Sequence, residues 1–149
     1  SFERIEVRDP LRVVLANSGV TADTSTLNDF VLGLKDADPG LFDQRMAKIT
    51  GQSMAMKEAL ENFDLNTVGS LMTANHEILI DMGLSHEKII ELCERALDLG
   101  ALGAKVTGGG RGGYMLSLAP DEDVQNVIAS AFEEDGLAVI RASIPGESA

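Results

Sequence analysis

Apolar and polar residues follow two different spacings along this chain, and the spacings distinguish its strands from its helices. The continuous apolar run from Leu11 to Ala16 predicts a buried strand, and the alternation from Leu137 to Ile144 predicts a final one. A strand from Tyr114 to Leu118 would form a hairpin with the residues around Ala104. We therefore expect two strands near the ends of the chain and a hairpin in its second half.

Apolar residues spaced by three and four predict five helices, four after the first strand and one after Pro120. Short polar residues stand where the first four helices should begin and can cap their free N–H groups. These expected caps are Asp23 or Thr24, Asp38, Asp64 and Ser85. Gly83 and Gly100 should end the third and fourth helices. The expected inward-facing residues include Phe63 on the second helix, Leu97 on the fourth, and the core-filling methionines Met46, Met54, Met56, Met72 and Met82.

The predicted order of elements is β-α-α-α-α-β-β-α-β, which is typical of an α+β fold. A small, mostly antiparallel sheet of the ferredoxin-like kind, packed by helices on one face, is the simplest architecture for this order. No long linker interrupts the pattern, so residues 1–149 are expected to form one domain with a substantial core.

The segment Lys105-Val106-Thr107-Gly108-Gly109-Gly110-Arg111-Gly112-Gly113, the glycine segment below, has five glycines in its last six positions. Glycine adopts positive φ freely, and consecutive N–H groups in such a loop can form an anion-binding hollow. A plain hairpin turn is the alternative, although it requires only one or two positive φ angles. We predict that this segment contacts phosphate, with Lys105 and Arg111 as its cations. It lacks the Lys-Ser/Thr pair of a Walker A loop.

Charge and composition exclude several other classes of protein. Acidic residues number 24 against 12 basic ones, and the net charge of −12 argues against nucleic-acid binding through a basic face. No apolar run approaches the length of a membrane span, and the single Cys93 cannot form an internal disulfide. These features favour a globular protein of a reducing, cytoplasmic compartment.

Few side chains outside the glycine segment suggest chemistry, and we predict no catalytic residue within this chain. His76 and His86 have no partners at metal-ligand spacing, so we expect structural roles for both and no metal site. Cys93 lies on an apolar helical face and should be an inert core thiol. Asn75 interrupts an apolar stripe, so its amide needs partners within the fold, at the glycine segment or on a ligand. Thr24 can cap its helix or reach a ligand from that N-terminus.

Three segments of the chain resemble the GHMP small-molecule kinases, a family that includes galactokinase, homoserine kinase, mevalonate kinase and phosphomevalonate kinase. Residues 100–113 are similar to the third, glycine-rich motif of this family. Residues 16–20 with Asp23-Thr24, and Asn75-His76 with residues 82–86, are most similar to the mevalonate kinase branch. The chain departs from the motif at Arg111, where a small or apolar residue is common, and at Tyr114, where cysteine is common.

The resemblance implies the C-terminal half of a two-domain enzyme that transfers the γ-phosphoryl group of ATP to an alcohol, with mevalonate expected as the acceptor. It implies that Thr24 lies near the acceptor and that the glycine segment approaches the nucleotide phosphates. The residues implied at the nucleotide are Lys105, Thr107, Gly108, Gly109, Gly110, Arg111, Gly112 and Gly113. The Mg²⁺ ligands and the catalytic residues would lie in an N-terminal half, so this chain alone should be inactive. Its opening residues, which lack Met, look like the interior of a longer chain.

The acceptor and the oligomeric state stay open. A galactokinase or phosphomevalonate kinase half would fit the same fold, and a homodimer is one assembly that we keep open. A non-catalytic ligand-binding or regulatory module is the alternative from a different class, because one fold supports many functions.

Overall fold

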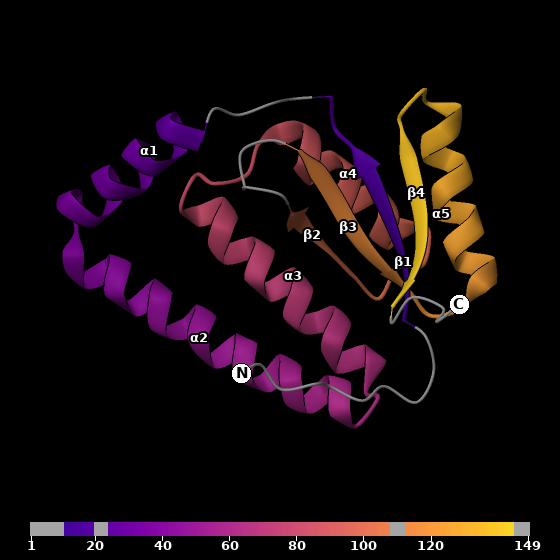
Figure 1. Cartoon of the computed structure of the whole chain (residues 1–149), viewed down its shortest axis with the longest axis horizontal. Helices are drawn as coiled ribbons and strands as arrows, with labels where there is room; N and C mark the ends of the chain where they lie inside the picture. Colours follow the sequence, from indigo (N-terminus) through magenta and orange to yellow (C-terminus); the bar gives the residue numbers. More distant parts are fainter. Residues whose placement is uncertain (1–10, 20–23, 108–112, 145–149) are drawn as a thin grey trace.

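The computed structural model describes residues 11–19, 24–107 and 113–144 of the chain. Within them, five helices and four strands follow the predicted order β-α-α-α-α-β-β-α-β (Figure 1), which confirms the α+β class. The strands are β1 (Leu11–Asn17), β2 (Gly103–Thr107), β3 (Tyr114–Ala119) and β4 (Val139–Ile144). The helices are α1 (Thr24–Ala37), α2 (Pro39–Glu61), α3 (Leu65–Asp81), α4 (Glu87–Asp98) and α5 (Glu122–Glu134). No described helix is long and apolar enough to cross a bilayer.

The four strands form one antiparallel sheet in the order β2-β3-β1-β4. In its centre, Val14 of β1 lies opposite Ser117 of β3, while Val13 lies opposite Ala142 of β4. Strands β2 and β3 form the predicted hairpin. The whole is a split β-α-β-β-α-β arrangement in which the first crossover consists of four helices. The expected ferredoxin-like sheet is therefore confirmed.

One face of the sheet is covered by α4 and α5. The residues between them form the most completely buried of the apolar clusters, which is called the dry core below. Val14 of β1 and Met115 of β3 point into this core and have no exposed surface. They meet Ile89 of α4 and Phe132 of α5, which are equally buried. The apolar residues of both helices recur every three or four positions, so a single stripe on each is enough to cover the sheet.

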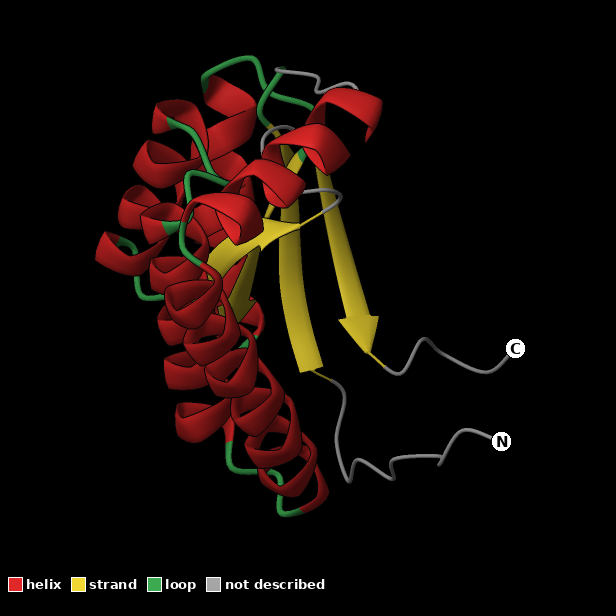
Figure 2. Cartoon of the chain, turned by 90° about the vertical axis from the view of Figure 1, so that its left-hand side faces the viewer, coloured by secondary structure: helices red, strands yellow, loops and turns green. Residues whose placement is uncertain are grey.

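The other face is covered only in part, by α2 and α3. Val13 and Leu118 pack there against Val68 of α3. Ile140 of β4 is 49% exposed, and Figure 2 shows β1 and β4 along one side of the molecule with the helices gathered on the other. The prediction of helices on one face alone was wrong. The run from Leu11 to Ala16 is apolar on both faces of the strand, and a strand of this kind needs cover on both.

Helix α3 approaches β2 closely because glycine stands on both elements. A Cβ atom on Gly69 would collide with the backbone carbonyl of Leu102, and one on Gly103 would collide with the carbonyl of Gly69. Only residues without a side chain permit this contact. The close approach brings Asn75, further along α3, within reach of Lys105 on β2.

Three of the five methionines expected in the core are packed there, and two are not. Met56, Met72 and Met82 join apolar clusters, whereas Met46 is 39% exposed and Met54 is 71% exposed. Met54 lies two positions before Met56, which places it on a different face of α2. Assigning all five to the core was therefore wrong for Met46 and Met54.

The boundaries of the helices confirm some predictions and correct others. Asp38 and Asp64 cap α2 and α3 as expected, each accepting a backbone N–H bond. Phe63 lies beyond the end of α2 with a φ of 51°, yet it still packs against the α2–α3 cluster. Leu97, expected inside, is 37% exposed in the last turn of α4. The N-cap of α4 is His86 rather than Ser85, and its side chain makes no cap hydrogen bond.

Candidate functional site

Strands β2 and β3 hold the two ends of the glycine segment side by side. Thr107, the last residue of β2, pairs with Tyr114, the first residue of β3. Gly113 precedes β3 with a φ of 81°, in the region that favours glycine. Residues 108–112, including Arg111, lie outside the described residues. The segment therefore connects a hairpin, as the alternative interpretation required, and its contact with phosphate stays a prediction.

The start of β3 is tied to the end of β1. Ser18 donates to the carbonyl of Gly113 from both its backbone N–H, at 3.0 Å, and its hydroxyl, at 2.8 Å. Asn17 Oδ1 accepts the N–H of Gly19 at 2.9 Å, which closes a turn in which Gly19 has a φ of 78°. Two segments that the sequence singled out separately therefore meet at one end of the sheet.

Lys105 projects from β2 toward α3. Its ammonium donates to Asn75 Oδ1 at 2.6 Å, and Asn75 Nδ2 donates to Gln52 Oε1 on α2 at 3.3 Å. Burial lowers the pKa of Lys105 below its ordinary value, because desolvation disfavours the charged form. Asn75 thus takes one of its predicted roles, since it ties α3 to the strand that leads into the glycine segment.

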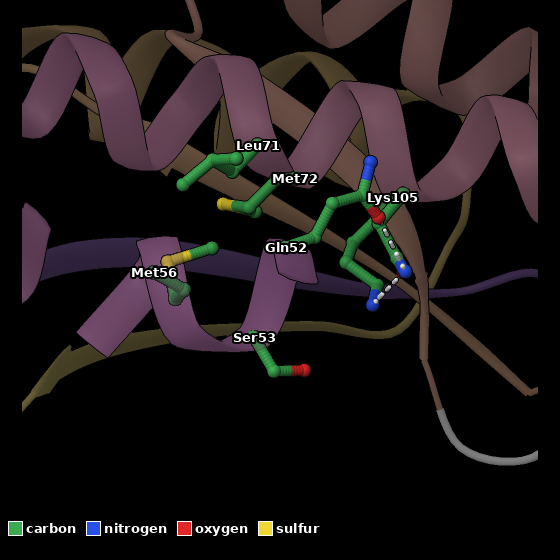
Figure 3. A pocket seen from close by; sticks show the side chains of 7 residues that line it. Gln52, Ser53, Met56, Leu71, Met72 and Lys105 are labelled. Atoms are coloured by element: carbon green, nitrogen blue, oxygen red, sulfur yellow. Dashed lines mark hydrogen bonds between the residues drawn. The ribbon is translucent and has the colours of Figure 1, made fainter. Parts of the chain in front are cut away.

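An open pocket of about 250 Å³ lies beside this chain of hydrogen bonds (Figure 3). It is lined by Gln52, Ser53 and Met56 of α2, by Leu71, Met72 and Asn75 of α3, and by Lys105 of β2. Figure 3 shows the two thioethers and the leucine at one end and the Lys105 ammonium at the other. The pocket is therefore amphipathic, with a cation at its polar end.

His76 is a structural residue next to this pocket. Its side chain is only 4% exposed, and its Nε2 shares a hydrogen bond of 2.8 Å with Ser85 Oγ. Desolvation, together with the positive charge of Lys105, lowers the pKa of His76 to about 4, so the ring is neutral at pH 7. The predicted structural role of His76 is confirmed. The same bond occupies the Ser85 hydroxyl that was expected to cap α4.

Two further predictions concern reactive groups. Cys93 is buried between the sheet, α4 and α5, and burial raises the pKa of its thiol to about 12, which confirms an inert core cysteine. In the part of the chain that the structure describes, no three His, Cys, Asp or Glu side chains are grouped to hold a metal ion.

Thr24 is the first residue of α1, but its side chain lies outside the described part of the chain. Its contact with an acceptor therefore stays a prediction. Of the predicted nucleotide residues, the described part contains Lys105, Thr107 and Gly113. Thr107 and Gly113 flank the loop of the β2–β3 hairpin, whereas Lys105 lies in the middle of β2.

Sequence reasoning missed Gln52 and Ser53. A weak signal exists, because Gln52 stands four residues before Met56 and so shares its face of α2. An amide on the surface of a long helix is ordinary, however. Only the packing of α2 against α3 shows that Gln52 meets Asn75.

Comparison with known proteins places the chain in a family. The family model of the GHMP kinases C terminal matches residues 56–137. The mevalonate kinase of Thermococcus onnurineus is 47% identical over 137 residues, covering 89% of this chain and 40% of that protein. The mevalonate kinase of Pyrococcus furiosus is 45% identical over 142 residues, covering 91% of this chain and 41% of that protein. The chain thus spans about two fifths of the length of these relatives.

A solved structure supports the same assignment. The crystal structure of L. major mevalonate kinase in complex with R-mevalonate matches all of this chain with a TM-score of 0.91 and 27% identity. The chain covers 47% of that structure. The family match, the sequence identities and the shared fold agree with one another, and the chain belongs to the GHMP kinase family as a C-terminal domain.

Proposed function

We propose that this chain is the C-terminal half of an ATP-dependent kinase that phosphorylates a small alcohol, with mevalonate as the acceptor. The observation that carries the proposal is the double hydrogen bond from Ser18 to Gly113. This bond joins two segments. One is the glycine segment, which we assign to the nucleotide phosphates, and the other leads into α1 and Thr24, which we assign to the acceptor. A phosphoryl donor and its acceptor must be held within a few ångström of each other, so two substrate-binding segments should be neighbours.

In this proposal the domain acts by positioning and by electrostatics. The backbone N–H groups from Gly108 to Gly113 surround phosphate oxygens, and the β2–β3 hairpin fixes the two ends of that loop. Thr107 and Arg111 add side-chain donors, and Thr24 orients the acceptor. Phosphoryl transfer relies on such positioning and on Mg²⁺, which neutralises developing charge. We place the Mg²⁺ ligands and the group that activates the hydroxyl in an N-terminal half.

The identity of 47% and 45% to two mevalonate kinases favours mevalonate over other acceptors. Galactose and phosphomevalonate are the alternatives within the same fold. A non-catalytic module is the alternative of a different class, and it predicts ligand binding without turnover.

The test is ADP release by the chain alone and by the chain joined to the N-terminal domain of the Thermococcus onnurineus mevalonate kinase. We expect no turnover from the chain alone and mevalonate-dependent turnover from the joined protein. Galactose and phosphomevalonate serve as competing acceptors in parallel assays. Turnover by the isolated chain would refute our placement of the catalytic groups.

A matched pair of glycine variants distinguishes an effect on ATP binding from an effect on folding. In the joined protein, Gly110→Val should raise the KM for ATP at least about tenfold, because a side chain blocks the approach of phosphate to the backbone. Gly51 lies on α2, where an added Cβ atom would meet nothing within 4 Å, so Gly51→Val should leave the KM for ATP unchanged. Unfolding midpoints of both variants show whether the loss of ATP use reflects loss of folding.

A further inference from the structure

Lys105 is a half-buried cation, and no carboxylate of the described residues balances its charge. Its one hydrogen bond goes to the neutral amide oxygen of Asn75, and no acidic side chain of the described residues lies within ion-pair distance of it. An ammonium has three donors, so two remain for other acceptors. A charge that is partly removed from water is stabilised most by an anion that can reach it directly.

The pocket next to Lys105 has the size and the polarity of a site for a small organic anion. Its volume of about 250 Å³ equals that of about eight water molecules. This volume is below the usual range for pockets that bind drug-sized ligands. Met56, Leu71 and Met72 form the apolar end (Figure 3). At the polar end, Asn75 accepts from the ammonium and donates to Gln52. An occupant should therefore carry one charged group at one end of a short hydrocarbon body.

We propose that this pocket binds a small aliphatic carboxylate, with a carboxylate oxygen on the Lys105 ammonium and its hydrocarbon chain against Met56, Leu71 and Met72. A carboxylate fits better than a phosphate because the described lining of the pocket presents one positive charge, and its other residues lie inside α2 and α3, where backbone N–H groups bond within the helix. Gln52 and Asn75 supply amide N–H groups for the second carboxylate oxygen. The proposal goes beyond the kinase function and does not depend on it. It assigns Lys105 to this pocket instead of to phosphate, and it leaves the predicted phosphate contact to the rest of the glycine segment, from Thr107 to Gly113.

The methionines of the chain provide a direct test. The sequence contains six of them, and two, Met56 and Met72, line the pocket. With ¹³C-labelled methionine methyl groups, titration with 4-methylpentanoate should shift these two signals saturably. Met54, which is 71% exposed, and Met115, which is fully buried, should not shift. A ligand of this size should bind with a Kd of about 1–10 mM.

Two comparisons decide whether the charge matters. The neutral isostere 4-methylpentanamide should bind the wild-type chain at least about fivefold more weakly than the carboxylate, and this measurement needs no variant. Lys105→Met removes the ammonium but keeps the aliphatic stem, and it should weaken carboxylate binding to the same degree. Lys48→Met makes the same charge change at an exposed position of α2 and should bind like the wild type.

Three outcomes would overturn the proposal: equal binding of acid and amide, unchanged binding by Lys105→Met, or shifts at Met54 as large as those at Met56. All of these measurements are made without nucleotide and without an N-terminal domain. A failure of these binding tests therefore does not contradict the kinase proposal. In the same way, a joined protein without kinase activity does not contradict the carboxylate site.

Discussion

The two faces of the sheet are packed in different ways. On one face, α4 and α5 enclose the dry core, in which Ile89, Met115 and Phe132 have no exposed surface. On the other face, α2 and α3 leave an open pocket in which Lys105 and Asn75 remain polar and half-buried. The first face has the features of a stabilising core, and the second has those of a binding site.

The difference shows how one hairpin can serve both purposes. Alternate residues of a strand point to opposite faces. On β2, Val106 therefore enters the dry core, while its neighbour Lys105 points into the pocket. A rigid core fixes the hairpin that carries the glycine segment, and water that reaches the pocket makes a cation tolerable there.

Truncation of side chains tests this contrast most strongly. Phe132→Ala should lower the free energy of unfolding by about 3–5 kcal/mol, because it leaves a closed cavity in the dry core. Met56→Ala should cost only about 1 kcal/mol, because its site already opens to solvent and part of the side chain is exposed. Urea-induced unfolding measures both. Equal losses would show that the two faces are packed alike.

The order of elements could be predicted from the sequence because each signal for it is local. Caps such as Asp38 and Asp64, and the spacing of apolar residues, depend only on near neighbours along the chain. The apolar run of β1 shows that its second face needs cover, but which helices provide that cover could not be predicted in this way. It depends on where α2 and α3 return in space, and hence on the contact between Gly69 and Gly103.

The candidate site was predictable to the same extent. The glycine segment stands out by composition, and Asn75 stands out as an amide among apolar residues. The hydrogen bond between Asn75 and Lys105 joins residues 30 positions apart, and the bond between Ser18 and Gly113 spans 95. No periodic pattern reports such pairs, because they are set by tertiary packing alone.

Acidification should act on the pocket side of the protein through His76. The pKa of its ring is lowered from 6.5 to about 4 in the fold, so the folded state binds fewer protons than the unfolded state between these values. The stabilisation that this provides is present above pH 6.5 and is lost as the pH falls toward 4. Between pH 7 and pH 5 the loss should reach about 2 kcal/mol.

A variant without the imidazole tests this prediction. His76→Gln should flatten the dependence of the free energy of unfolding on pH between 7 and 5, whatever the variant's own stability. The wild-type chain, measured in parallel, should show the full slope. If the slope survives in His76→Gln, then other groups cause it and the neutral His76 in the fold is not supported.

The smallest effects are expected at the hydrogen bond between Lys105 and Asn75, where the sign of each change matters more than its size. Asn75→Ala leaves the half-buried ammonium without its acceptor and should cost about 1–2 kcal/mol of unfolding free energy. Lys105→Met removes the charge along with its desolvation penalty, so its stability should stay within about 0.5 kcal/mol of wild type. The double variant should then be more stable than Asn75→Ala alone, because no unsatisfied ammonium remains. Urea unfolding of all four proteins gives the coupling energy directly. If the two losses simply add, the amide does not hold the cation, and the polar side of the sheet is no more than solvated surface.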